Sequence, residues 1–169
     1  MKGIDKFSGK ILGGITKIQV TEQSNVNGFT EPSSGIVMDS EITFTDEDAV
    51  YNLFGTIDAA GFGSPQGNTE HGVRFSPAVS LAVPKLTSPT GANLEEMLRK
   101  PLFVLVFDRN QNVRIMGTKQ DGDDVTCIID EATGDAPLGS NKYSLQFIWE
   151  SAHQPYYYTG TTVDGVGAE

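Results

Sequence analysis

The feature that most constrains this chain is a run of six consecutive apolar residues, Leu102 to Phe107, which ends at Asp108. Successive side chains of a strand point to opposite faces of the sheet, so an uninterrupted apolar run predicts a strand that is covered on both faces. The fold must therefore supply two apolar layers, one on each side of this strand.

The segment before the run, SPTGANLEEMLRKP, predicts a short helix. Asn93 is a candidate N-cap and Pro101 ends the helix, since proline cannot continue it. Three apolar side chains fall on one helix face: Leu94, Met97 and Leu98. We expect this helix to cover one face of the strand 102–108.

Apolar and polar residues alternate in several other segments, which predicts half-buried strands. The turn RNQN (109–112) joins the strand 102–108 to VRIMGTK in a hairpin, onto which GDDVTCIID (122–130) pairs. In the last strand, KYSLQFIWES, four aromatic or apolar residues share one face: Tyr143, Leu145, Phe147 and Trp149. Further strands are expected at about residues 14–21, 35–45 and 73–84.

The segment DEDAVYNLFG (46–55) leaves two alternatives open. Thr45 or Asp46 could cap a short helix whose acidic first turn suits the helix dipole. The same residues could instead form an extended strand.

The remaining segments define the domain organisation. With 169 residues, 19 of them Gly and 8 Pro, the chain is typical of one β-rich domain with many turns. We expect this domain to span residues 1–158, with long loops at 23–34 and 55–72, and residues 159–169 to form a flexible tail. A loop as long as 55–72 is usually functional or ordered by a partner.

Charge excludes one class of partner. Twelve basic and 22 acidic residues give a formal net charge of −10, which disfavours direct binding to the phosphate backbone of a nucleic acid. The acidity serves either solubility or a surface that repels something anionic. The N-terminal residues lack the apolar core of a signal peptide, and no stretch approaches about 18 apolar residues. The single cysteine, Cys127, favours a structural role, and we place the protein in a reducing cytoplasm without a membrane partner.

The sequence carries no recognisable catalytic machinery. Only two histidines occur, His71 and His153, and neither has a nucleophile pattern beside it. The motifs of serine hydrolases, zincins and P-loop proteins are absent. The acidic clusters Asp46–Asp48 and Asp121–Asp124 do not have EF-hand spacing, and the second is better explained as a solvated turn. We therefore expect a protein that is not an enzyme, with no catalytic residue, no cofactor and no metal site.

Three consecutive tyrosines follow Pro155. Adjacent side chains of a strand face opposite sides, so at least one ring is exposed unless a second layer covers it. The tyrosines are either a strand end that packs on the core or an interface that could also stack on carbohydrate. The candidate interface residues are Phe62 and His71 in the loop 55–72, together with Tyr156, Tyr157 and Tyr158.

The second half of the chain resembles a family of small virion proteins of tailed bacteriophages, the tail-tube and ring-forming proteins of phages and prophages of Bacteroidetes-like hosts. The likeness rests on NLEEMLRKPLFVLVFDRNQNVRIMG, in which a helix leads into a central strand and a hairpin, and on NKYSLQFIWESAHQPYYY, a closing strand that ends in aromatics.

This resemblance implies a mainly β fold, an antiparallel β-sandwich or barrel with one short flanking α-helix. It also implies a homo-oligomeric ring, commonly a hexamer, which stacks in the tail or neck of the virion with other tail or neck proteins. DNA would pass through the ring without specific binding, and an acidic lumen would keep it from sticking. Such a protein is made in the cytoplasm of the host bacterium. The alternative is a monomeric β-sandwich that serves as an adhesion or carbohydrate-binding module.

Overall fold

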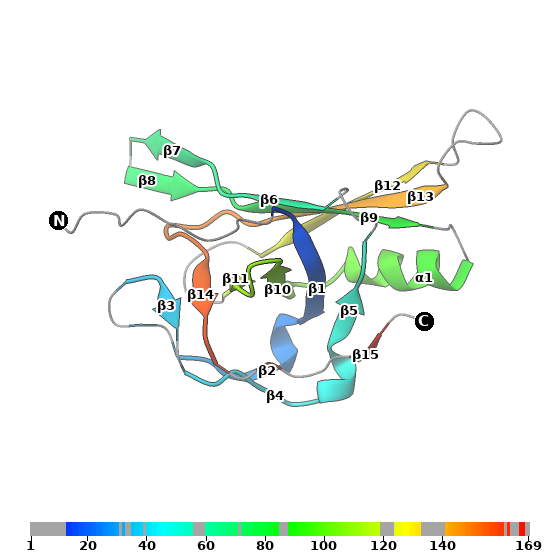
Figure 1. Cartoon of the computed structure of the whole chain (residues 1–169), viewed down its shortest axis with the longest axis horizontal. Coiled ribbons are helices and arrows are strands. Elements are labelled where there is room, and N and C mark those ends of the chain that lie inside the picture. Colours follow the sequence, from blue (N-terminus) through cyan, green and yellow to red (C-terminus); the bar gives the residue numbers. More distant parts are fainter. Residues whose placement is uncertain are drawn as a thin grey trace.

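The computed structural model describes residues 13–30, 32, 35–38, 40–55, 60–70, 72–84, 88–118, 124–132, 141–160, 162 and 166–167. Two β-sheets face each other, and one helix lies at the side of the layers (Figure 1). The expected mainly β, sandwich-like fold with a flanking helix is confirmed. Within the described residues neither sheet closes on itself, so the fold is not a barrel.

The larger sheet has seven strands, and β10 (Leu102–Asp108) lies at its centre. Strand β10 pairs antiparallel with β1 (Ile15–Glu22) on one side and with β11 (Val113–Met116) on the other. The complete strand order is β15 (Val166–Gly167), β5 (Tyr51–Leu53), β1, β10, β11, β14 (Tyr156–Tyr158) and β3 (Val37–Met38). The two outermost pairings, β15 with β5 and β14 with β3, are parallel.

The second sheet is built on β13 (Lys142–Ile148), the predicted closing strand. Its order is β12 (Thr126–Ala132), β13, β9 (Ala78–Pro84) and β6 (Gly61–Gly63). The predicted inward face of the closing strand is confirmed, because all four of its residues are buried: Tyr143, Leu145, Phe147 and Trp149.

Burial of β10 on both faces is confirmed. Leu102, Val104 and Val106 join the cluster between the two sheets, while Phe103 and Leu105 join a second cluster on the opposite face. That second layer includes Met38, Ile42, Ile115, Tyr156 and Tyr158. The alternation of side chains along the strand sends successive residues into different clusters, which explains the unbroken apolar run.

The helix α1 (Ser88–Met97) begins earlier than the sequence indicates. Asn93 therefore lies inside the helix and is not its N-cap, which corrects the prediction. Leu94 and Met97 pack with the cluster between the sheets, whereas Leu98 follows the helix and is exposed. The helix contributes to the same cluster as the second sheet. The other face of β10 is covered by apolar side chains of two other segments, namely Val26, Phe29, Met38, Ile42 and Phe44, and Tyr156 and Tyr158 of β14.

The segment 46–55 adopts both of the expected alternatives in succession. A 3₁₀ turn, η2 (Glu47–Ala49), precedes the short strand β5. Asp46 is the cap, because its side chain accepts a hydrogen bond from the backbone N–H of Asp48 at 3.0 Å.

Several short elements differ from the sequence predictions. The single strand expected at 35–45 is two strands, β3 and β4 (Thr43–Phe44), which belong to different sheets. The loop 23–34 contains a 3₁₀ turn, η1 (Gln23–Asn25), and β2 (Val26–Gly28), which pairs with β4. The loop 55–72 contains β6, β7 (Gln66–Thr69) and the start of β8 (Gly72–Phe75). These strands are two to four residues long, too short for alternation to reveal them.

The hairpin of β10 and β11 is confirmed, but β12 does not continue it. The neighbour of β11 is β14, and β12 pairs with β13 in the second sheet. Gly117 ends β11 with φ of 88°, and a Cβ there would lie 2.3 Å from the carbonyl oxygen of Leu102. Only glycine tolerates this approach, so Gly117 allows the chain to leave the larger sheet.

The expected tail 159–169 contributes strand β15, and the backbone N–H of Thr159 donates to the carbonyl of Met38 at 2.9 Å. Its flexibility stays a prediction. In the described part of the chain, no helix is long and apolar enough to cross a membrane.

Replacing Phe147 by Ala tests the core assignment. Phe147 is fully buried, so we expect the free energy of unfolding to fall by about 3–5 kcal/mol in urea titrations. The matched control is Ile128→Ala on the adjacent strand, where the side chain is 47% exposed and the expected change is within about 0.5 kcal/mol. Equal losses in the two variants would contradict the packing described here.

Candidate functional site

Arg114 lies between two aromatic rings. Its guanidinium carbon is 4.8 Å from the ring centre of Phe62 and 4.5 Å from that of Tyr157. Both distances are within the range of cation–π attraction, which contributes about 0.5–1 kcal/mol at an exposed site and more where water is excluded. The three residues therefore act as one group, the Arg114 stack.

The strand registers explain how these residues meet. Arg114 pairs with Val106 on one side and with Tyr157 on the other, so the three side chains share one face of the larger sheet. Val106 belongs to the cluster between the sheets, which identifies this face as the inner one. Phe62 comes from β6, the edge strand of the second sheet. The Arg114 stack therefore joins the two sheets where their layers meet at β6.

A cavity of about 220 Å³ lies beside the Arg114 stack, and its lining includes Gly13, Gly14, Ile15 and Asp108. The Asp108 carboxylate accepts hydrogen bonds from the backbone N–H of Asn110 at 2.8 Å and from the backbone N–H and side-chain amide of Asn112. Asp108 therefore holds the β10–β11 turn. Arg114 forms no ion pair within the described residues, and the contacts of its guanidinium there are with the two rings.

The predicted interface residues separate into two groups. Tyr156 and Tyr158 are 5% and 4% exposed and belong to the core cluster behind β10. The Tyr158 hydroxyl also accepts a hydrogen bond from the backbone N–H of Ile42 at 3.2 Å. Both rings are core residues, and their assignment to an interface is not supported by this geometry.

Phe62 and Tyr157 are half-buried and are brought together by Arg114. His71 lies outside the described residues. Sequence reasoning missed Arg114, although one signal was present, a cation between apolar neighbours in the strand VRIM. The Tyr157 ring is covered on one face by the guanidinium, which reduces the surface it offers for stacking on a sugar.

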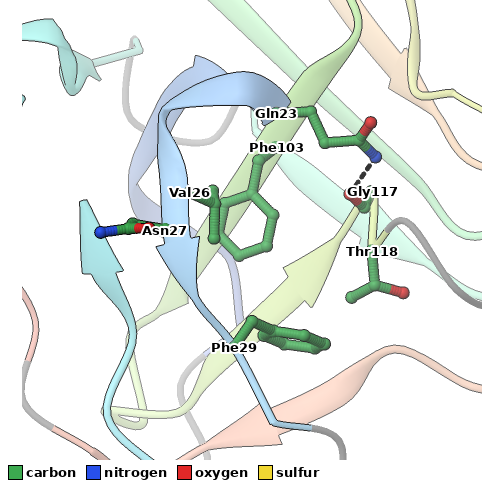
Figure 2. A pocket seen from close by; sticks show the side chains of 7 residues that line it. All are labelled: Gln23, Val26, Asn27, Phe29, Phe103, Gly117 and Thr118. Carbon is green, nitrogen blue, oxygen red and sulfur yellow. Dashed lines mark hydrogen bonds between the residues drawn. The ribbon is translucent and has the colours of Figure 1, made fainter. Parts of the chain in front are cut away.

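A second cavity, of about 230 Å³, opens between β2 and β10 (Figure 2). Phe29 and Phe103 line it and meet edge to face, with ring centres 6.3 Å apart. The Gln23 side-chain amide donates to the carbonyl of Gly117 at 2.8 Å across its rim. The hydroxyl of Thr118 is buried without a partner, but Figure 2 shows it turned away from the two rings. No converging polar groups mark this cavity as a binding site.

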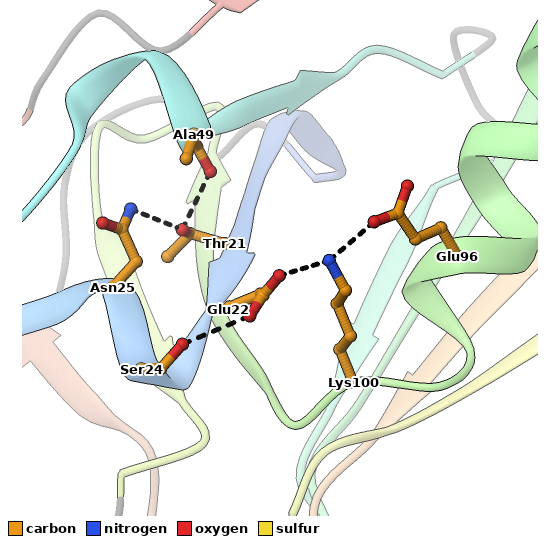
Figure 3. A network of polar contacts seen from close by, with 7 residues as sticks. All are labelled: Thr21, Glu22, Ser24, Asn25, Ala49, Glu96 and Lys100. Atoms are coloured by element: carbon orange, nitrogen blue, oxygen red, sulfur yellow. Dashed lines mark hydrogen bonds and ion pairs between the residues drawn. The ribbon is translucent and has the colours of Figure 1, made fainter.

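A polar network ties the end of β1 to the end of α1 (Figure 3). The ammonium of Lys100 pairs with the carboxylates of Glu22 and Glu96. These hydrogen bonds raise the pKa of Lys100, and the bond from Lys100 lowers the pKa of Glu22. The groups are exposed to solvent and lie at no cavity, so the network has a structural role.

The described part of the chain includes one cysteine, Cys127, and several side chains of the types that ligate metals. No group of three or more metal-ligating side chains occurs there. Cys127 is half-buried on β12, and burial raises the pKa of its thiol from 9.0 to about 11. A thiol with so high a pKa holds its proton at neutral pH and is a poor nucleophile.

No protein-family model matches this chain, and neither a curated protein nor a solved structure matches it. Its function has to be argued from its own geometry.

The pKa of Cys127 gives one test. The alkylation rate of the folded protein with iodoacetamide should rise with pH toward a midpoint near 11, because only the thiolate reacts. The urea-unfolded chain is the control, and its midpoint should lie near 9.0. A folded midpoint as low as that of the unfolded chain would show that β12 does not shield the thiol.

A double-mutant cycle tests the Arg114 stack. Arg114→Gln, Tyr157→Leu and the double variant should give a coupling of about 0.5–2 kcal/mol in the free energy of unfolding, because either change alone removes the cation–π contact. The measurement is urea unfolding at a protein concentration where only monomer is present. Additive effects would mean that guanidinium and ring do not interact.

Proposed function

We propose that this chain is a virion structural protein of a tailed bacteriophage. It self-assembles into rings, most simply hexamers, that form part of a tail tube or of the head–tail conduit through which DNA passes. Its partners are copies of itself and other tail or neck proteins, and it is made in the cytoplasm of the host bacterium.

The observation that carries this proposal is the hairpin of β7 and β8, here called the arm (residues 66–75). It projects from the sandwich at the side opposite α1 (Figure 1). All its described side chains are exposed except that of Phe75, which is half-buried. A two-stranded hairpin alone is at best marginally stable in water, so an arm of this kind gains stability from a surface outside its own subunit.

The base of the arm fixes its direction. Phe75 and Ser151 exchange backbone hydrogen bonds of 2.8 and 2.9 Å, and the Arg74 guanidinium pairs with the Glu150 carboxylate at 2.6 Å. These contacts lie where the arm joins the rest of the subunit. The arm is therefore fixed to its own subunit at Arg74 and Phe75. A neighbouring subunit can contact the part of the arm that lies beyond these residues.

Exposed apolar residues support the same proposal. Val37 on β3 and Ile128 on β12 are 55% and 47% exposed, and both strands are edges of their sheets. An edge strand offers unpaired backbone groups to another chain, and an apolar side chain on it adds contact area. Val73 on the arm is 45% exposed. The molecule thus offers several surfaces for neighbouring copies.

The net charge of −10 fits a conduit for DNA. A protein that lines a channel for a polyanion must not bind its phosphates, and an excess of carboxylates prevents this. The order of helix, central strand, hairpin and closing strand on which the phage resemblance rests is also present, as α1, β10, β11 and β13.

Shortening the arm tests the proposal. Gly67 and Arg74 are paired, so residues 68–73 can be replaced by Asn-Gly, which forms a tight two-residue turn. We expect the wild-type protein to form rings or tubes in light scattering and negative-stain microscopy, and the shortened variant to be a folded monomer. A wild-type protein that stays monomeric at every concentration would contradict the proposed function.

Two matched point variants localise the effect. Val73 on β8 and Leu98 directly after α1 are 45% and 46% exposed. The elements β8 and α1 lie at opposite sides of the molecule (Figure 1). Val73→Asp should weaken assembly, because a charge in the contact would have to be desolvated, whereas Leu98→Asp should leave it unchanged. Equal effects would show that the arm has no special part in assembly.

A further inference from the structure

The guanidinium of Arg114 has hydrogen-bond donors that the described residues do not use. Two rings contact the guanidinium of Arg114, and its N–H groups are donors of the kind that bind a carboxylate. The side chain of Arg114 makes neither a hydrogen bond nor an ion pair with the described residues, and it lines a cavity of about 220 Å³. A half-buried guanidinium held in a fixed orientation beside an open cavity is a receptor for a carboxylate.

The protein itself offers a carboxylate of the right kind. Asp46, Glu47 and Asp48 form an exposed acidic turn, and none of the three is in an ion pair within the described residues. With 22 acidic and 12 basic residues, carboxylates are the most numerous charged groups that a second copy presents.

This acidic turn is held firmly. Asn25 donates from its side-chain amide to the carbonyl of Asp46 at 2.8 Å and accepts from the backbone N–H of Asp46 at 2.8 Å. The hydroxyl of Thr21 donates to the carbonyl of Ala49 at 2.9 Å, as Figure 3 shows. A preorganised turn loses little conformational entropy when it binds.

The receptor and the acidic turn lie at opposite ends of β1. Ile15 at the start of the strand lines the cavity, and Thr21 near its end binds the turn. Through Val106, Arg114 lies level with Ile18 and two strands away from β1, whereas the turn precedes β5 on the other side of β1. Three strand spacings of about 4.8 Å therefore separate them across the sheet, in addition to their offset along the strands. The turn therefore cannot reach Arg114 of its own subunit.

We propose that the Arg114 cavity of one copy receives a carboxylate of the Asp46–Asp48 turn of the next copy. This inference rests on the proposed function and names a contact between subunits in addition to that of the arm. Two different surfaces at opposite ends of the subunit make a heterologous, head-to-tail interface, which generates rings or filaments. Asp108 also lines the cavity, but its oxygens are already engaged by Asn110 and Asn112.

Charge reversal on both sides tests the contact. Arg114→Glu and the paired change Glu47→Lys/Asp48→Lys should each weaken subunit association by about 30-fold or more, as loss of one partner of a buried charge pair does. Combining the changes in one chain should restore association to within a few-fold of wild type. The turn variant alters only exposed side chains, so it reports on assembly even if Arg114→Glu fails to fold.

The matched control is Glu95→Lys/Asp124→Lys, which changes the net charge equally at exposed carboxylates elsewhere. Association is measured by light scattering over a dilution series, with unfolding curves to confirm the fold. A turn variant that assembles like this control, or a combined variant no better than the single changes, overturns the inference and leaves the proposed function standing. A wild-type protein that never assembles overturns both.

Discussion

The structure depends on the complete burial of β10. Because its side chains alternate between two apolar clusters, this strand requires a layer on each face, and the rest of the chain supplies them. The second sheet and α1 cover one face. Tyr156 and Tyr158 of β14 cover the other, together with apolar side chains of the first half of the chain, namely Val26, Phe29, Met38, Ile42 and Phe44. The positions of β6 and the Arg114 stack follow from this arrangement, since both lie where the two layers meet.

The sequence predicts the elements with strong local patterns and misses those without. The central strand, its hairpin, the helix and the closing strand are recognisable because each carries seven or more patterned residues or a definite turn. The edge strands β3 and β6 are only two and three residues long, and their partners come from distant segments. The path of β12 into the second sheet depends on Gly117 and its contact with Leu102, which no local pattern reveals.

The same reasoning applies to the candidate site. Phe62 and Tyr157 are recognisable as aromatic residues in glycine-rich or tyrosine-rich surroundings. Arg114 is not, because its two ring partners come from β6 and β14 and only the sheet registers bring them together. Tyr156 and Tyr158 share the composition of Tyr157 but point to the opposite face of β14, where they are core residues. Composition identifies the residue types, whereas the face of the strand on which each side chain lies decides whether it belongs to the core.

The pairing of β1 with β10 also sets when the protein can fold. Glu22 pairs with Leu102, and at the sheet edge Val37 pairs with Tyr157, so the larger sheet joins segments from both ends of the chain. Contacts this distant in sequence slow folding, since a long loop must close before they form. During synthesis β1 has no partner until Leu102–Asp108 has emerged from the ribosome, and the edge strand β3 has none until Tyr157 has emerged. The larger sheet therefore forms only after most of the segments between its strands have been made.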